Sequence, residues 1–197
     1  MEKDVFRKYE YAQKMLDIEL NILIDAFEKK HGYNPVEHTK TRIKKEDSIL
    51  KKLEEKGYEY TTTNIQKYVK DVVGYRIVVS FISDVYDIVS LITHSTNIII
   101  KERRDYILNP KESGYTSYHL IVLVPIYLEN VVEYIQAEIQ VRTVAMDFWA
   151  SLDHKIRYKF PEAIPEEVKK EMESYSKDIQ ELDKKMYDLN QIMSRYQ

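Results

Sequence analysis

The apolar residues of this chain recur every three or four positions near both of its ends. Over residues 4–30 they form a stripe at helical spacing, which predicts a helix that ends near His31 and Gly32. The same spacing returns after Pro165 in a highly charged segment and predicts a second long helix over residues 166–197. The apolar positions of that segment are Val168, Met172, Tyr175, Ile179, Leu182, Met186, Leu189 and Met193.

Between these helices the pattern changes to strands and shorter helices. β-Branched and aromatic residues predict a buried strand over 74–82, and residues 97–107 predict another. Two further strands, 117–126 and 131–141, are predicted to form a hairpin that turns at residues 128–130. Shorter helices are expected from about Asp47 to Lys56, Ser83 to His94 and Thr143 to Tyr158. This order predicts an α+β fold, a mixed sheet of about four to five strands flanked by helices.

Length and composition indicate a single globular domain. The chain has 197 residues, of which 44% are hydrophobic and 32% are charged, so it can bury one core. We expect one domain over residues 1–197, with its core at about 35–160 and terminal helices at 4–30 and 166–197. The sequence has no cysteine, which excludes disulfides and thiolate metal sites.

The distribution of charge narrows the class of function. The formal net charge of −3 does not indicate a DNA-binding protein, and it gives no positive sign of RNA binding, which stays open. The first residues are charged rather than apolar, and no apolar run approaches ~18 residues, so we expect a cytoplasmic protein without a membrane segment. Lysine and arginine nevertheless cluster in residues 40–52 and 101–104, which suggests a local anionic ligand rather than only a solvated surface.

Two carboxylates are the first candidates for chemistry. Glu138 lies within an otherwise apolar predicted strand, where a carboxylate is costly unless it meets a metal, a cation or a substrate proton. Asp71 precedes the predicted strand at 74–82, and carboxylates on adjacent strands can converge on Mg²⁺. The residues alone leave simpler alternatives: a turn or capping role for Asp71, and a buried ion pair of Glu138 with Arg76 or Arg142.

Four blocks of sequence resemble the synthetase domain of the RelA/SpoT family, which makes the alarmones pppGpp and ppGpp of the stringent response. The blocks are TRIKKEDSILKK, DVVGYRIVVSF, PKESGYTSYH, and EIQVRT with MDFWA and DHKIRYK. They occur in the family's order over about residues 41–159, and four motifs in order are far more specific than one. A chain of one domain is most similar to the small alarmone synthetases. The resemblance implies a nucleotidyltransferase-like fold with its active cleft across one face of the sheet.

The resemblance explains the cationic cluster as an ATP site. The implied ATP-binding residues are Arg42, Lys44, Ser48, Lys52 and Arg76. The two arginines would stack on the faces of adenine, and the other three residues would hold phosphates. Ser48 and Lys52 are one helical turn apart, and Ser48 lies near the start of its predicted helix, where backbone amides favour phosphate. The alternative is a charged, solvated helix.

The acceptor nucleotide is implied to lie against the GYTSYH loop. The implied guanine-nucleotide-binding residues are Lys111, Tyr115, His119, Gln140, Arg142 and Asp147. Tyr115 offers a face on which guanine can stack, and Gly114 lets backbone approach a ligand closely. Asp147 can read guanine because a carboxylate accepts hydrogen bonds from both N1–H and the N2 amino group. In the same predicted helix, Trp149 and His154 are expected to be structural.

These residues together predict a GTP/GDP 3′-pyrophosphokinase that uses Mg²⁺. The metal, held by Asp71 and Glu138, would bridge the phosphates of ATP, and Glu138 would help activate the 3′-hydroxyl of the acceptor. The resemblance also implies a homotetramer. The C-terminal helix would be ~45 Å long, more than a domain of this size can cover, so we expect it to pack on another subunit together with the N-terminal helix. The alternative is a helix that folds back on its own core. Two alternatives are an inert nucleotide- or RNA-binding module and a nucleotidyltransferase with another acceptor. Retention of both carboxylates argues against the inert module.

Overall fold

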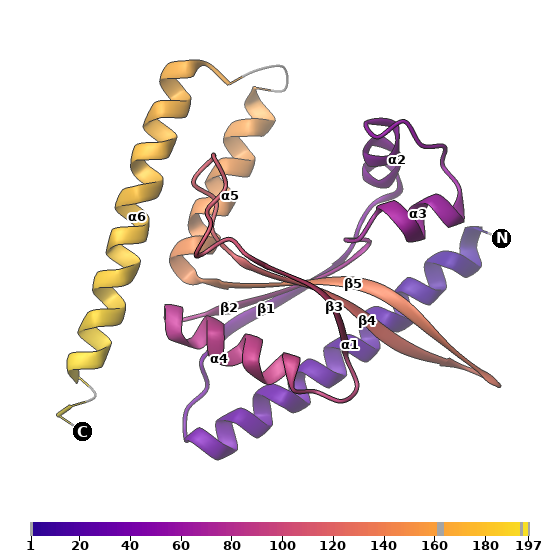
Figure 1. The fold of residues 1–197 in the computed structure, drawn as a ribbon, viewed down its shortest axis with the longest axis horizontal. Helices are drawn as coiled ribbons and strands as arrows, with labels where there is room; N and C mark the ends of the chain where they lie inside the picture. Colours follow the sequence, from indigo (N-terminus) through magenta and orange to yellow (C-terminus); the bar gives the residue numbers. More distant parts are fainter. Residues whose placement is uncertain (1, 161–163, 194, 197) are drawn as a thin grey trace.

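A mixed five-stranded sheet forms the centre of the protein (Figure 1). The computed structural model describes residues 2–160, 164–193, 195 and 196. The strands are β1 (Val36–Ile43), β2 (Val73–Val79), β3 (Ile99–Asp105), β4 (Tyr118–Leu128) and β5 (Val131–Thr143). The helices are α1 (Glu2–His31), α2 (Glu46–Glu54), α3 (Thr62–Tyr68), α4 (Ile82–Thr93), α5 (Val144–Lys159) and α6 (Glu166–Met193). The predicted α+β fold is confirmed.

The strand order, β1-β2-β5-β4-β3, places two strands that are distant in sequence at the middle of the sheet. Strands β2 and β5 are parallel neighbours, whereas the other adjacent pairs are antiparallel. The predicted hairpin is β4–β5, and Glu129 at its turn has a positive φ of 43°. In the parallel pair Gly74 lies opposite Glu138, so Asp71, just before β2, comes to the same region of the sheet.

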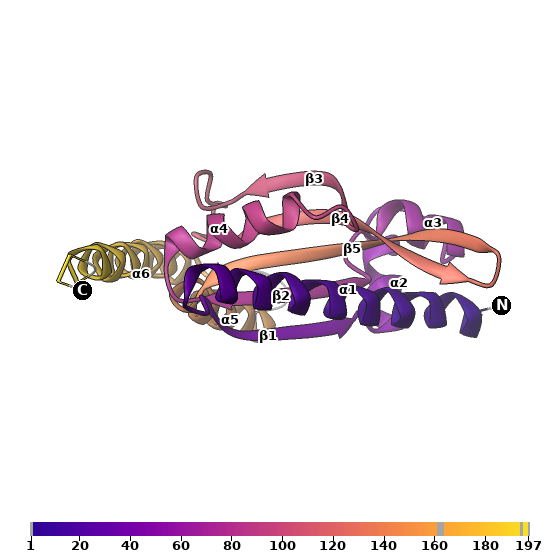
Figure 2. The same ribbon diagram turned by 90° about the horizontal axis from the view of Figure 1, so that it is seen from below.

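Helices α1 and α4 cover one face of the sheet (Figures 1 and 2). Helix α1 contacts β1, β2, β4 and β5, and α4 contacts β2 and β5. Tyr75 of β2 points into this layer, where it is buried and its hydroxyl donates to Asp17 of α1 at 3.0 Å. Because side chains alternate along a strand, the neighbours of Tyr75 in β2 project from the opposite face. Helices α2 and α3 lie at one end of the sheet, and α5 and α6 lie at the other.

The C-terminal helix α6 packs against α5 and α4 through a face that is more polar than its predicted stripe. Its buried residues are Met172, Ser176 and Asp183. Its other face exposes Tyr175, Leu182, Met186, Leu189, Ile192 and Met193. Of the predicted helix over 166–197, residues 194 and 197 lie outside the described residues. No helix within the described ranges combines the length and apolarity needed to cross a membrane.

Two elements were not predicted from the sequence pattern. Strand β1 lies at the edge of the sheet and most of its side chains are exposed, so its sequence lacks a clear alternation of apolar and polar residues. Its pairing with β2 stabilises it through the backbone. Helix α3 has only 7 residues, with Ile65 as its buried side chain, and Thr61 caps it by accepting from the Asn64 amide at 3.2 Å.

Candidate active site

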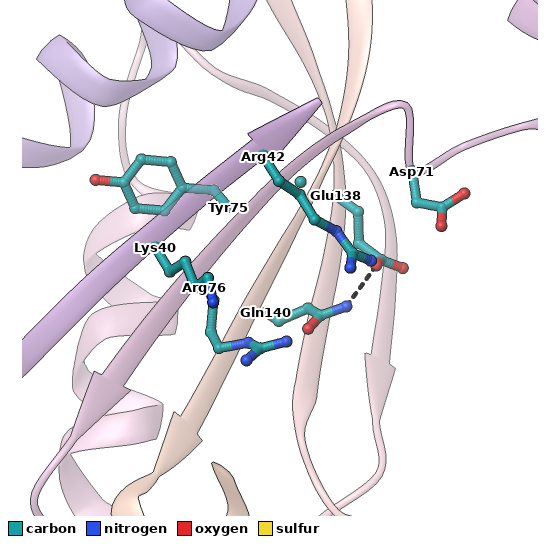
Figure 3. Close-up of a pocket in the computed structure, with 8 residues that line it drawn as sticks. Lys40, Arg42, Asp71, Tyr75, Arg76, Glu138 and Gln140 are labelled. Atoms are coloured by element: carbon teal, nitrogen blue, oxygen red, sulfur yellow. Dashed lines mark hydrogen bonds between the residues drawn. The ribbon is translucent and has the colours of Figure 1, made fainter. Parts of the chain in front are cut away.

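Two rows of side chains cross the face of the sheet opposite α1. The strand register places Arg42, Gly74 and Glu138 in one row. The adjacent row consists of Lys40, Arg76, Gln140, His119 and Arg104. Residues two apart in a strand share a face, so both rows project to the same side. They form the floor of a cleft whose lining includes Lys40, Arg42, Asp71, Gly74, Arg76, Glu138 and Gln140 (Figure 3).

Asp71 lies at one end of this cleft and is held by two lysines. Its carboxylate accepts from Lys44 Nζ at 2.7 Å and from Lys52 Nζ at 2.6 Å. Burial disfavours the charged carboxylate, but the hydrogen bonds and charges of the two lysines outweigh burial and lower the pKa of Asp71 to about 2. Asp71 is therefore a carboxylate at neutral pH, and it contacts two of the residues predicted to hold phosphates.

Glu138 lies on the floor of the same cleft (Figure 3). One carboxylate oxygen accepts from Gln140 Nε2 at 2.7 Å, and the other lies 3.3 Å from His119 Nδ1. Burial disfavours the charge of Glu138, but contacts with His119 and then Gln140 hold its pKa below the ordinary value. The side chain that pairs with Glu138 is therefore His119 and not Arg76 or Arg142, because both guanidinium groups pair with Asp147 instead.

The donor set of the cleft fits Mg²⁺. Asp71 and Glu138 line the same cleft, so both carboxylates can reach one ion bound there. Within the described residues, no group of three or more His, Asp or Glu side chains could hold a metal. Two carboxylates completed by substrate phosphates and water are the usual Mg²⁺ environment.

The two arginines predicted to bind ATP lie where the cleft meets a second pocket. Arg42 and Arg76 line the cleft and also an adjoining pocket. The Nε group of Arg76 is buried without a hydrogen-bond partner among the described residues, so a ligand in the cleft could satisfy it. Ser48 is exposed in the first turn of α2, as predicted, but it lines neither pocket.

The adjoining pocket lies between the sheet and α5. It shares Arg42, Arg76 and Gln140 with the cleft. Its remaining lining residues are Tyr115, Arg142, Ala150, Ser151, Asp153, His154, Lys155 and Arg157. His154 is exposed in this pocket, so the expectation that it is only structural is not supported. His154, Lys155 and Arg157 belong to the DHKIRYK motif. Their places on a predicted helix could have indicated that α5 lines a pocket.

Tyr115, which lines this pocket, is surrounded by cations. Its hydroxyl lies 2.8 Å from His119 Nε2 and accepts a hydrogen bond from Arg142. The Lys111 ammonium lies 4.8 Å from the centre of the Tyr115 ring, and the Arg142 guanidinium lies 5.0 Å from it. The structure thus brings together four of the residues predicted to bind the guanine nucleotide.

Asp147 links the two sides of the site. In the first turn of α5, its Oδ1 forms an ion pair with Arg76 Nη1 at 3.0 Å and accepts a hydrogen bond from Arg142 Nη1 at 3.1 Å. Arg142 is buried and also donates to Gln140 Oε1 at 2.8 Å. Asp147 therefore has two guanidinium partners before any guanine arrives, and its role as a guanine reader stays a prediction.

Two other predictions in this region have different outcomes. Trp149 is buried at 3% exposure, which confirms its structural role. Gly114 has a φ of +74°, and a Cβ there would overlap the hydroxyl of Ser176 in α6. Glycine is therefore needed for a left-handed turn against α6, and its role in admitting a ligand stays a prediction.

Comparison with known proteins identifies the family. The model of the region found in RelA/SpoT proteins matches residues 41–163, more than half of the chain. The chain belongs to the RelA/SpoT family. The matched region of this RelA/SpoT protein contains every residue that the motifs indicated, from Arg42 to Asp147.

Relatives and solved structures resemble the RelA/SpoT chain over nearly its whole length. It is 44% identical over 178 residues to the GTP pyrophosphokinase YwaC of Bacillus subtilis, and the aligned region covers 90% of this chain and 85% of YwaC. It is 33% identical over 184 residues to the GTP pyrophosphokinase YjbM of the same organism, covering 92% and 84% of the two chains. The crystal structure of small alarmone synthetase 2 from Bacillus subtilis matches with a TM-score of 0.86 at 39% identity, over 96% of this chain and 97% of that one. Small alarmone synthetase 1 bound to its product pppGpp matches with a TM-score of 0.86 at 32% identity, over 94% of each chain.

Sequence reasoning missed three side chains of this RelA/SpoT site and its surroundings. Lys40 lines the cleft two residues before Arg42, but β1 was not predicted, so this alternation was not visible. Ser176 and Gln180 of α6 bind the carbonyl of Gly114, and no motif marks them.

Proposed function

We propose that this chain is a GTP/GDP 3′-pyrophosphokinase. It transfers the β,γ-pyrophosphate of ATP to the 3′-hydroxyl of GDP or GTP, which yields ppGpp or pppGpp and releases AMP. The observation that carries the proposal is the pair Asp71 and Glu138 in a cleft that joins a cationic pocket. The 44% identity to a GTP pyrophosphokinase over 90% of this chain supports the same reaction.

Glu138 would accept the proton of the acceptor's 3′-hydroxyl as that oxygen attacks the β-phosphorus. Its lowered pKa keeps it charged at neutral pH, and contacts from His119 and Gln140 fix the orientation of its carboxylate. Mg²⁺, which Asp71 and Glu138 would hold, supplies neutralisation of the phosphate charge. Most of the remaining rate enhancement would come from placing the two nucleotides in line.

ATP would occupy the side of the cleft formed by β1, α2 and β2. Arg42 and Arg76 would stack on adenine, and the unpaired Nε of Arg76 gives this side a donor for a ligand. Lys44 and Lys52 already face Asp71, so they would meet the phosphates where the metal binds. Ser48 would add its hydroxyl from the first turn of α2.

The guanine nucleotide would occupy the pocket beside α5. Guanine would stack on Tyr115, and Lys111 and Arg142 stand close enough to this ring to reach acceptor phosphates. Asp147 would read the guanine edge by releasing one of its two guanidinium partners. His119 and Gln140 join this pocket to Glu138.

The predicted homotetramer fits two exposed apolar faces. On α6 six apolar side chains are exposed, and α1 exposes Tyr11, Met15, Ile18 and Ile22. Such faces on long helices favour burial against further copies of the chain. The cytoplasmic location stays a prediction, and it agrees with the nucleotides that the enzyme would consume.

Incubation of the purified protein with γ-labelled ATP and each of GMP, GDP and GTP tests the proposed reaction. We expect Mg²⁺-dependent transfer of label to GDP or GTP and one AMP released for each product formed. Release of AMP without a labelled guanosine product would indicate a different acceptor. Tight nucleotide binding without any turnover would indicate an inert binding module instead.

A further inference from the structure

The inner face of α6 carries three polar side chains that hold other elements. Ser176, Gln180 and Asp183 are spaced by four and three residues, so they lie on one face of the helix. Ser176 is only 1% exposed and Asp183 is 6% exposed. Gln180 is half-buried. Polar side chains that are buried normally have hydrogen-bond partners, and all three of these have them.

Two of the three bind the backbone of the acceptor loop. Ser176 Oγ donates to the carbonyl of Gly114 at 2.7 Å. Gln180 Nε2 donates to Ser176 Oγ at 2.9 Å and lies 3.4 Å from the same carbonyl. Gly114 packs so closely against Ser176 that a Cβ at this position would overlap the hydroxyl. The third side chain, Asp183, accepts from Thr143 Oγ1 at 2.7 Å at the start of α5.

The Gly114 carbonyl lies within the turn that positions Tyr115. The Gly114 amide donates to the Lys111 carbonyl at 2.8 Å, and the Lys111 amide donates to the Tyr115 carbonyl at 3.1 Å. The hydroxyl end of Tyr115 is held from the sheet by His119 and Arg142. The backbone end of the same residue is held from α6, through Gly114.

We propose that Ser176, supported by Gln180, is a positioning residue for the acceptor nucleotide. It acts through Gly114 and fixes the turn that presents Tyr115 and Lys111 to guanine and phosphate. This inference rests on the proposed function, because it assumes that the GYTSYH loop binds the acceptor. A loop that is already ordered binds its ligand without a further loss of conformational entropy, so loosening this contact weakens acceptor binding.

The inference predicts an effect that is confined to one substrate. Four of the five residues proposed to bind ATP lie on β1, α2 and the segment between them, at the end of the sheet away from α6 (Figure 1). Glu138 lies in β5 and is held by His119 and Gln140, which α6 does not contact through any of the hydrogen bonds described. Loss of the Ser176 hydroxyl should therefore change acceptor affinity and leave kcat at saturating GTP almost unchanged.

The test compares Ser176→Ala, Gln180→Met and the matched control Lys177→Ala. Lys177 is exposed on the outer side of α6, next to Ser176 in sequence. The measurements are KM for GTP, KM for ATP and kcat, together with calorimetric titration of GTP in the absence of ATP. We expect the KM and Kd for GTP to rise roughly three- to tenfold in the first two variants, as for one lost buried hydrogen bond. Lys177→Ala should match the wild type.

Tyr115→Ala, measured in parallel, separates this inference from the proposed function. If Tyr115→Ala raises the KM for GTP while Ser176→Ala and Gln180→Met leave it unchanged, α6 does not position the acceptor and the inference is wrong. If Tyr115→Ala also leaves it unchanged, the assignment of the acceptor loop is wrong. Thermal unfolding identifies a variant that fails to fold. If Ser176→Ala fails to fold, the KM and Kd for GTP of Gln180→Met decide the question, because this change removes the supporting amide and keeps the side-chain length.

Discussion

Asp71 and Glu102 provide a matched test of how burial controls the strength of an ion pair. Each carboxylate binds two cations and has a pKa of about 2. The Asp71 side chain is 13% exposed, with lysine partners that are 17% and 33% exposed. The Glu102 side chain is 36% exposed, with Lys70 and Arg104 at 43% and 35%. We predict that Asp71→Asn lowers the free energy of unfolding far more than Glu102→Gln.

The size of the Asp71 effect follows from its pKa. The pKa falls from 3.8 to about 2, and each pKa unit corresponds to ~1.4 kcal/mol, so the charged carboxylate contributes ~2–3 kcal/mol at neutral pH, the attraction of the two lysines less the cost of burial. Because the folded-state pKa is lowered, this contribution is fully present above pH 3.8 and is lost as the pH falls through about 2. The shift at Glu102, from 4.5 to about 2, corresponds to only ~0.2–1 kcal/mol, since solvent screens an exposed pair.

Urea unfolding of the metal-free proteins at pH 7 and pH 3 measures both effects. Asp71→Asn should lose ~2–3 kcal/mol at pH 7 and roughly half as much at pH 3, where the native carboxylate has lost part of its advantage. Glu102→Gln should stay within ~1 kcal/mol of the wild type at pH 7. Equal losses in the two variants, or an Asp71→Asn loss that does not change with pH, would refute the reasoning.

Three further predictions concern α6 and the acceptor pocket. Burial raises the pKa of Asp183, and the hydrogen bond from Thr143 offsets this only in part, so the charged carboxylate destabilises the fold above its folded pKa. Asp183→Asn should therefore raise Tm at pH 7, and the gain should vanish below pH 3.8. A lower Tm of this variant at pH 7 would contradict the prediction. Tyr115→Ala should raise the KM for GTP roughly tenfold, because stacking on an aromatic ring is worth ~1–3 kcal/mol, while the KM for ATP stays constant. Leu182→Glu combined with Met186→Glu should lower the mass measured by light scattering, and an unchanged mass would show that the exposed face of α6 is not the subunit contact.

The helices and strands that could be predicted are those in which burial of one face produces a regular spacing of apolar residues in the sequence. Strand β2 was expected at 74–82 and spans Val73–Val79, because five of its seven residues are buried and are apolar. The edge strand β1 was missed because its exposed side chains follow no such period, and backbone pairing with β2 stabilises it. The stripe on α6 was recognised, but the helix buries a different face, since that face carries the hydrogen bonds to the acceptor loop.

In the site, motifs identified the residues but not their partners. Glu138 contacts His119 because β4 and β5 pair in a particular register, which the sequence does not state. Asp147 meets two arginines only after α5 folds beside β2 and β5. Ser176 and Gly114 are 62 residues apart and meet through the docking of α6. Such contacts depend on tertiary structure, so they could not be derived from local patterns.

The central claim is that Glu138 is the catalytic carboxylate of a pyrophosphate transfer. Glu138→Gln keeps the size of the side chain and can keep a hydrogen bond to Gln140, but it removes the negative charge. In a single-turnover assay with γ-labelled ATP and GTP at saturating Mg²⁺, we expect label transfer to fall at least ~100-fold, since general base catalysis contributes ~10²–10⁴-fold. Calorimetry should show GTP binding within a fewfold of the wild type. A variant that still transfers label at a rate within a fewfold of the wild-type protein would contradict the account.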